Sequence, residues 1–215
     1  MFVYALCQRI VWLVTFAAMR LFTRFSINGG EHLKGIKTPL LIVANHRSYW
    51  DAMIVGTLFP FFSNRYLPIG FMAADEYFSN PFSKIFFVLT GTYPAYKGRG
   101  LDVSLQYPRS VLKSGGVVLL FPFGKINVSD TAKESPYRGA GMLVKEFSHL
   151  WILPVYLNTA PNLGLWDFIF GRKEMSARIG VPFQAEPALI ERDAREITAR
   201  LVDKIVALSQ MRSEL

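Results

Sequence analysis

An apolar run that ends abruptly in polar residues lies at positions 40–51, which read LLIVANHRSYWD. Its first five residues are continuously hydrophobic, which is typical of a strand covered on both faces of a parallel sheet. Similar short runs recur along the chain and alternate with stretches of helical character. This alternation predicts an α/β fold with a mostly parallel central sheet flanked by helices. We expect strands at 40–44, 67–73, 91–96, 117–121, 152–156 and 176–179, and helices at 51–58, 81–89, 101–113, 139–146 and 187–211.

The polar half of this stretch holds a histidine and an aspartate, His46 and Asp51, just after the expected strand. In α/β proteins, the residues that bind ligands or catalyse reactions commonly follow the carboxyl ends of the strands. The aspartate can fold back to hold one imidazole nitrogen while the other faces a substrate. Such a base removes a proton from an acceptor hydroxyl, which then attacks a thioester directly, so no serine nucleophile is required. The alternative is structural, with Asp51 capping a helix and His46 an ordinary loop histidine.

Length and composition limit the remaining possibilities. The chain has 215 residues, enough for one domain with a complete core. Apolar residues make up 51% and charged residues 19%, which excludes a disordered or coiled-coil protein. The net charge of +8 favours an anionic partner, and 4 Trp, 9 Tyr and 18 Phe favour phospholipid over nucleic acid. The single cysteine, Cys7, excludes an intrachain disulfide and a cysteine-rich zinc site.

The N-terminal segment, residues 1–25, is strongly apolar. Its longest uncharged internal run, 10–19, has ten residues, about half of what a helix needs to cross a ~30 Å hydrocarbon core. On a helix, Arg9, Arg20 and Arg24 fall within an arc of about 60°. We therefore predict an amphipathic helix that lies in one leaflet, with its arginines at anionic headgroups. The alternative is a helix packed on the core or on a second subunit.

Several other chemistries are disfavoured by the motifs that are missing. The sequence has no Gly-x-Ser-x-Gly nucleophile elbow. Gly124-Lys125 is followed by Ile126 where a phosphate loop has Ser or Thr, and Gly98-Arg99-Gly100 lacks the third glycine of a dinucleotide fingerprint. The three histidines have no helical metal-ligand spacing. We expect neither a metal nor an organic cofactor.

The segment 45–51 resembles the Asn-His-x-Ser-x-x-Asp block of the glycerolipid acyltransferases, the 1-acylglycerol-3-phosphate O-acyltransferases of the PlsC type. Further blocks of this family have counterparts in the same order over roughly residues 26–182. They are the lead-in at 28–33, the strand segment at 91–97, the Phe-Pro-Glu-Gly-Thr block at 121–125, the Lys-Gly-Ala helix at 138–140 and the Val-Pro-Val strand at 153–155.

This resemblance implies an acyltransferase domain over 26–215, preceded by a membrane-interface helix over 1–25. His46 would be the general base and Asp51 its orienting partner. The donor would be an acyl-CoA or an acyl-carrier-protein thioester, the acceptor a lysophospholipid-like molecule, and the location the cytoplasmic face of the inner membrane. The implied substrate-binding residues are Asn45, Ser48, Lys97, Arg99, Phe123, Gly124, Lys125 and Arg138.

The sequence departs from the family pattern around the acceptor's polar end. Phe123 stands in place of the glutamate of the third block, Lys125 in place of a threonine, and Lys97 in place of an arginine. A phenyl ring cannot accept the hydrogen bonds of a carboxylate, and lysine lacks the bidentate phosphate geometry of arginine. Either the acceptor is a different hydroxyl-bearing lipid or its headgroup is held less specifically. Two alternatives stay open, a lipid-binding protein that has lost efficient catalysis and a thioesterase in which His46 activates water.

Overall fold

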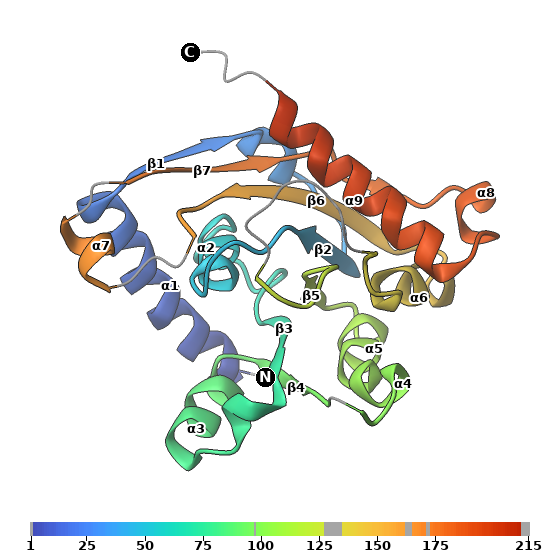
Figure 1. The fold of residues 1–215 in the computed structure, drawn as a ribbon, viewed down its shortest axis with the longest axis horizontal. Helices are drawn as coiled ribbons and strands as arrows, with labels where there is room; N and C mark the ends of the chain where they lie inside the picture. The colour runs from blue at the N-terminus through green and yellow to red at the C-terminus, as the bar shows by residue number, and fades with distance from the viewer. Residues whose placement is uncertain (1, 97, 127–134, 162–164, 171–172, 212–215) are drawn as a thin grey trace.

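The computed structural model describes residues 2–96, 98–126, 135–161, 165–170 and 173–211 (Figure 1). Within these residues, eight strands form one sheet in the order β1-β7-β6-β2-β5-β3-β4, with β8 paired to β6. The strands are β1 (Arg24–Asn28), β2 (Leu40–Ala44), β3 (Ile69–Ala74), β4 (Thr92–Ala95), β5 (Val117–Leu120), β6 (Trp151–Asn158), β7 (Glu174–Ile179) and β8 (Phe183–Gln184).

The helices lie between and around these strands (Figure 1). The α-helices are α1 (Phe2–Phe22), α2 (Asp51–Thr57), α3 (Pro81–Leu89), α4 (Leu101–Ser104), α5 (Gln106–Lys113), α6 (Gly139–Glu146), α7 (Leu165–Phe170), α8 (Pro187–Ile190) and α9 (Ala194–Gln210). Two short 3-10 helices, η1 (Gly30–Leu33) and η2 (Asp75–Phe78), complete the described elements.

The predicted mostly parallel sheet is confirmed. β2 pairs in parallel with β5 and β6, and β3 pairs in parallel with β4 and β5. β7 and β8 run antiparallel to β6, and β1 runs parallel to β7. The carboxyl ends of β6, β2, β5, β3 and β4 therefore meet at one edge of the sheet, where an α/β fold places its chemistry.

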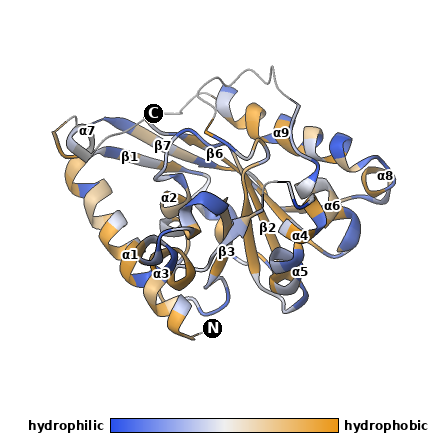
Figure 2. Ribbon diagram, turned by 60° about the horizontal axis from the view of Figure 1, so that its bottom comes forward, coloured by the Kyte–Doolittle hydropathy of each residue, from blue (hydrophilic) through white to orange (hydrophobic). Residues whose placement is uncertain are grey.

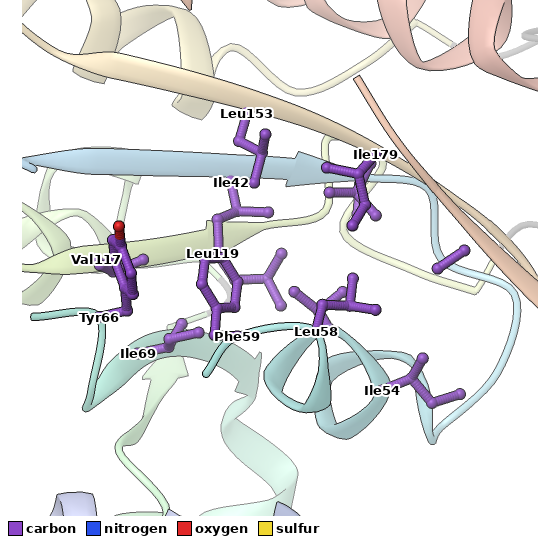
Figure 3. Packing of buried hydrophobic residues seen from close by; sticks show 14 of the residues in the cluster. Ile42, Ile54, Leu58, Phe59, Tyr66, Ile69, Val117, Leu119, Leu153 and Ile179 are labelled. Atoms are coloured by element: carbon purple, nitrogen blue, oxygen red, sulfur yellow. The ribbon is translucent and has the colours of Figure 1, made fainter. Parts of the chain in front are cut away.

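Both faces of the sheet are covered, and β2 lies between the two layers with all five residues buried. Ile42 and its neighbours on one face pack against α1 and α2, as Figure 3 shows for Ile54 and Leu58 of the α2 segment. Leu41 on the other face packs against α5, α6 and α9. Burial on both faces explains why β2 is a continuous apolar run in the sequence.

The prediction for the N-terminal segment was wrong in two details. α1 ends at Phe22, and Arg24 opens β1, where it pairs in register with Glu174 of β7. Arg9 points toward the protein, because its guanidinium donates to Phe61 O at 3.0 Å and to Asn64 Oδ1 at 2.6 Å. Of the three arginines in the predicted basic stripe, only Arg20 lies exposed on the helix.

A buried glutamine attaches α1 to the sheet. The Gln8 side chain is fully buried and donates to the carbonyls of Ile69 and Thr90, each at 2.6 Å, while its Oε1 accepts from the Ile69 N–H at 2.9 Å. One turn later, the buried Trp12 ring lies directly against Gly56 of α2. These contacts make the inner face of α1 part of the domain core.

Substitution of Gly56 by alanine tests this packing. A Cβ at position 56 would overlap the Trp12 ring, so one of the two helices must shift. We expect the free energy of unfolding to fall by about 1–3 kcal/mol, although alanine is the better helix former. Chemical denaturation measures the change. Gly30→Ala is the control, because its Cβ meets nothing closer than Ile27 Cγ2 at 3.8 Å, and an equal loss in both variants would contradict the account.

Candidate active site

The candidate site lies where β2, β5 and β6 end. β2 ends at Ala44 and is followed by the loop that carries His46, β5 is followed by Phe121, and β6 is followed by Thr159. β2 lies between the other two strands in the sheet. Side chains from three segments that are far apart in the sequence are therefore brought to one place.

The predicted pairing of His46 with Asp51 is present. Asp51 opens α2, and its side chain folds back so that Oδ2 lies 2.9 Å from His46 Nδ1. The carboxylate is completely buried, whereas one fifth of the His46 side chain is exposed. With Nδ1–H donating to the carboxylate, Nε2 keeps its lone pair free to accept a proton from a substrate.

The Asp51 carboxylate is held by four further donors. Oδ2 accepts from the backbone N–H groups of Arg47 and Ser48, at 2.5 and 2.8 Å. Oδ1 accepts from the hydroxyls of Ser48 and Thr159, at 2.7 and 2.8 Å. A carboxylate fixed from so many directions has one orientation, and it holds the imidazole in one orientation as well.

An aromatic ring holds the other side of the imidazole. Phe121 stacks on His46 with ring centroids 4.1 Å apart and an interplanar angle of 11°. The ring directs the imidazole by packing alone, because a phenyl group offers no proton acceptor to compete with Asp51. Together the carboxylate and the phenyl ring fix the position and the plane of the imidazole.

Asn45 fixes the start of the histidine loop. Its side-chain amide donates to Leu157 O at 2.9 Å, and its Oδ1 accepts from the Leu157 N–H at 2.6 Å. The side chain thus continues the pairing of β2 with β6 one residue past the end of β2. The residue before His46 is thereby anchored to the neighbouring strand.

The third predicted block follows Phe121 as a tight turn. The Gly124 N–H donates to Phe121 O at 2.9 Å, and Gly124 has φ +62°, a conformation that favours glycine. A Cβ on Gly124 would lie 3.1 Å from the Tyr137 ring. Phe123 is half-buried in this turn, and Lys125 beside it is exposed.

For the other predicted cations, the structure shows no contact with His46 among the described residues. Arg138 is exposed directly before α6. Arg99 is exposed after β4, with its guanidinium 5.1 Å from the centre of the Tyr96 ring. β4 is the third neighbour of β2, about 14 Å away across the sheet. Lys97 lies outside the described residues.

Sequence reasoning did not identify Thr159, Phe121 or Tyr156 as site residues. Thr159 is buried and bonded to Asp51, although 108 positions separate the two residues. Tyr156 lies with its hydroxyl 3.4 Å from Arg47 Nη1. Thr159 could have been predicted from the order of the strands. It follows β6, and because β6 lies beside β2 in parallel, a side chain after β6 reaches the same edge of the sheet as His46.

Replacement of Thr159 by valine tests its role in positioning the base. The valine keeps the volume but removes one donor from Asp51 Oδ1, so we expect turnover to fall about tenfold with little change in KM. Steady-state kinetics measure both values. Thr159→Ser is the matched control and is expected to restore most of the turnover. A purely structural threonine would give equal losses of activity for valine and serine.

No group of three or more His, Cys, Asp and Glu side chains able to hold a metal ion lies among the described residues.

Comparisons with known proteins place this geometry in context. The profile of a protein family described as Acyltransferase matches residues 24–158, which include the histidine loop, the turn after β5 and all of β6. The fold is similar to the crystal structure of the 1-acyl-sn-glycerophosphate acyltransferase PlsC from Thermotoga maritima. The TM-score is 0.64 at 18% sequence identity, and the match covers 96% of this chain and 81% of that one. A search of curated protein sequences found no match.

Proposed function

Because the chain belongs to the acyltransferase family, we propose that it is a membrane-associated O-acyltransferase for lipid substrates. It transfers a fatty acyl group from an acyl-CoA or acyl-carrier-protein thioester to a hydroxyl of a lysophospholipid-like acceptor. The observation that carries the proposal is the bond between His46 Nδ1 and the buried Asp51 carboxylate at the end of β2. That bond leaves Nε2, on a partly exposed ring, as the one imidazole nitrogen available to a substrate.

The chemistry proceeds by general base catalysis. His46 Nε2 takes the proton of the acceptor hydroxyl as its oxygen attacks the thioester carbonyl. The tetrahedral intermediate collapses with cleavage of the carbon–sulfur bond, and the imidazolium returns the proton to the departing thiolate. Asp51 stabilises the imidazolium through the 2.9 Å bond to Nδ1 and keeps it correctly oriented. The products are the acylated lipid and a free thiol.

Direct transfer is preferred over an acyl-enzyme intermediate because the serine of the histidine loop, Ser48, is unsuitable as a nucleophile. Ser48 is 1% exposed, and its hydroxyl donates to Asp51 Oδ1 at 2.7 Å. A hydroxyl committed to a carboxylate in the interior cannot reach a thioester carbonyl. Ser48 instead helps to hold the catalytic carboxylate.

We assign the acceptor's polar end to the basic residues that follow β4 and β5 in the sequence and that precede α6. Lys97, Arg99, Lys125 and Arg138 supply positive charge suited to a phosphate or another anionic headgroup. Phe123 makes the turn after β5 more apolar than a glutamate would. We therefore expect one of two acceptors. Either the headgroup is glycerol phosphate and is held less specifically, or the acceptor is a lipid with a less polar headgroup.

Membrane association is assigned to α1, which runs along the outside of the domain and is mostly hydrophobic (Figure 2). By length and composition α1 is able to cross a membrane. Its inner face, however, is fixed to the domain through Gln8 and Trp12. The helix would have to leave the core to span a bilayer. We propose that it lies in the plane of one leaflet, on the cytoplasmic face of the inner membrane.

The experiment that tests the proposal combines purified protein with an acyl thioester and a panel of lysolipids, with mass spectrometry of the products. The panel contains lysophosphatidic acid, other lysophospholipids and lysoglycolipids, each with acyl-CoA and with acyl carrier protein as donor. We expect a new diacyl lipid with at least one acceptor. No product from any pair, with lysolipid still bound, would contradict catalysis and indicate a lipid-binding protein.

A thioesterase is the second candidate, because Phe123 alters the acceptor turn beside the base. In that case His46 activates water in place of a lipid hydroxyl. Free fatty acid released at the same rate with and without acceptor would identify hydrolysis as the main reaction.

A further inference from the structure

A tyrosine that the proposed function does not use lies on the turn after β5. The Tyr137 N–H donates to Pro122 O at 2.9 Å, so the segment before α6 runs beside this turn. The Tyr137 ring covers Gly124, because a Cβ on Gly124 would lie 3.1 Å from Tyr137 Cε2 and 3.2 Å from Cδ2. The tyrosine is nevertheless 65% exposed. It therefore presents an aromatic surface to solvent at this turn.

Short contacts connect Tyr137 to the base. Phe121 stacks on His46 with ring centroids 4.1 Å apart, and the Phe121 carbonyl accepts from the Gly124 N–H at 2.9 Å. The Cα atoms at the two ends of such a four-residue turn lie less than about 7 Å apart. Gly124, with the Tyr137 ring on it, therefore lies close to the imidazole. A lysophospholipid whose hydroxyl lies at His46 Nε2 can extend its headgroup over this distance.

The turn offers rings rather than hydrogen-bonding groups to a headgroup. It reads FPFGK over residues 121–125 and contains no acidic side chain. The Gly124 N–H is engaged by Phe121 O, and Phe123 has no side-chain acceptor. The Tyr137 ring covers the one residue of the turn that has no side chain. A headgroup beside this turn therefore contacts aromatic carbon.

Cations flank this aromatic surface. Lys125 follows Gly124 and Arg138 follows Tyr137, and both side chains are exposed. A phosphomonoester dianion is held best by the bidentate geometry of arginine, whereas lysine supplies a point charge. Lysines stand at positions 97 and 125, where the family has an arginine and a threonine. This charge pattern suits the single negative charge of a phosphodiester better than a phosphomonoester.

The second substituent of that phosphodiester must also fit the turn. A primary ammonium or a sugar hydroxyl needs hydrogen-bond partners, and Phe123 removes the acceptor that the family's glutamate offers. A quaternary ammonium has no N–H donor to satisfy, and it binds against the faces of aromatic rings. The loss of the glutamate and the position of the Tyr137 ring together favour a trimethylammonium group.

We propose that Tyr137 is a specificity-determining residue for the acceptor, and that the acceptor is a lysophospholipid with a phosphocholine headgroup. The trimethylammonium group lies against the rings of Tyr137 and Phe123, and the phosphate lies between Lys125 and Arg138. This inference rests on the proposed function, because it names the acceptor class of the same site. It selects a lipid with a less polar headgroup over one with glycerol phosphate.

Acceptor kinetics of the full-length chain test the proposal, with lysophosphatidylcholine and lysophosphatidic acid compared at a saturating acyl thioester. We expect the higher kcat/KM with lysophosphatidylcholine. For Tyr137→Leu we expect the KM for lysophosphatidylcholine to rise about 5- to 30-fold, the range of a cation–π contact, with kcat little changed. Tyr137→Phe keeps the ring and is expected to restore the KM. Phe62→Leu is the matched control, because Phe62 is 88% exposed and precedes β3, at the edge of the sheet opposite to His46.

Binding without turnover separates this inference from the proposed function. Equilibrium dialysis of lysophosphatidylcholine below its critical micelle concentration gives the Kd for the wild type and for Tyr137→Leu, and we expect the same fold-change as in KM. A wild-type KM in Tyr137→Leu, or an equal rise in the KM for lysophosphatidic acid, would overturn the inference and leave acyl transfer standing. A Kd that depends on Tyr137, with no transfer to any lysolipid, would support the headgroup site and contradict the proposed function.

Discussion

Replacement of His46 by alanine is expected to lower the turnover of acyl transfer by at least ~10²-fold, the usual scale for a lost general base. Without the imidazole, nothing at the end of β2 takes the proton of the acceptor hydroxyl. Phe121 and Asp51 stay in place, so the apolar surroundings of the site are retained. Initial rates at saturating acceptor, with thiol release followed by absorbance, measure the effect.

A second histidine provides the control for this variant. His149 is exposed and lies two residues before β6, at the opposite end of the strand from Thr159. His149→Ala is expected to keep the wild-type rate. Turnover of His46→Ala within a few fold of the wild type, with an unchanged unfolding midpoint, would remove His46 from the mechanism.

Asp51→Asn is expected to damage both activity and stability. The amide keeps the size of the side chain but replaces one acceptor oxygen by an NH2 donor, which must face one of the donors that surround it. We expect the free energy of unfolding to fall by about 2–4 kcal/mol, because the site is fully buried. The imidazole also loses its orienting partner, so turnover should fall at least ~10²-fold.

Denaturant unfolding and kinetics on the same preparation separate the two effects of Asp51→Asn. The comparison is with His46→Ala, which removes a partly exposed side chain and is expected to cost less stability while losing as much activity. A stable Asp51→Asn protein with wild-type turnover would show that the carboxylate neither orients the base nor holds the loop.

The sequence predicted an element correctly where burial alone determines its pattern of apolar and polar residues. β2 has the predicted bounds because a strand covered on both faces is a continuous apolar run. β1 was missed because its sequence, RFSIN, is largely exposed, and its pairing partner β7 lies 150 residues away. The predicted helix at 101–113 divides at Leu105, since Pro108 has no N–H to continue the ladder from α4.

In the candidate site too, residues of one short segment could be predicted from the sequence, whereas contacts between distant segments could not. His46 and Asp51 were identified from their positions after an expected strand and from the resemblance of residues 45–51 to the acyltransferase block. Thr159 reaches Asp51 only because β6 lies beside β2, a neighbour relation that residue spacing does not contain. The inward turn of Arg9 was equally hidden, because its partners belong to the segment after α2.

The central claim is acyl transfer by His46, and the most direct test follows an isotopically labelled acyl group. Purified protein is incubated with labelled acyl thioester and the preferred lysolipid, with His46→Ala in parallel, and the lipids are analysed by mass spectrometry. The account predicts labelled diacyl lipid and free thiol in equal amounts with the wild type, and at least ~10²-fold less of both with the variant. Equal labelling by the two proteins, or label found only in free fatty acid, would contradict it.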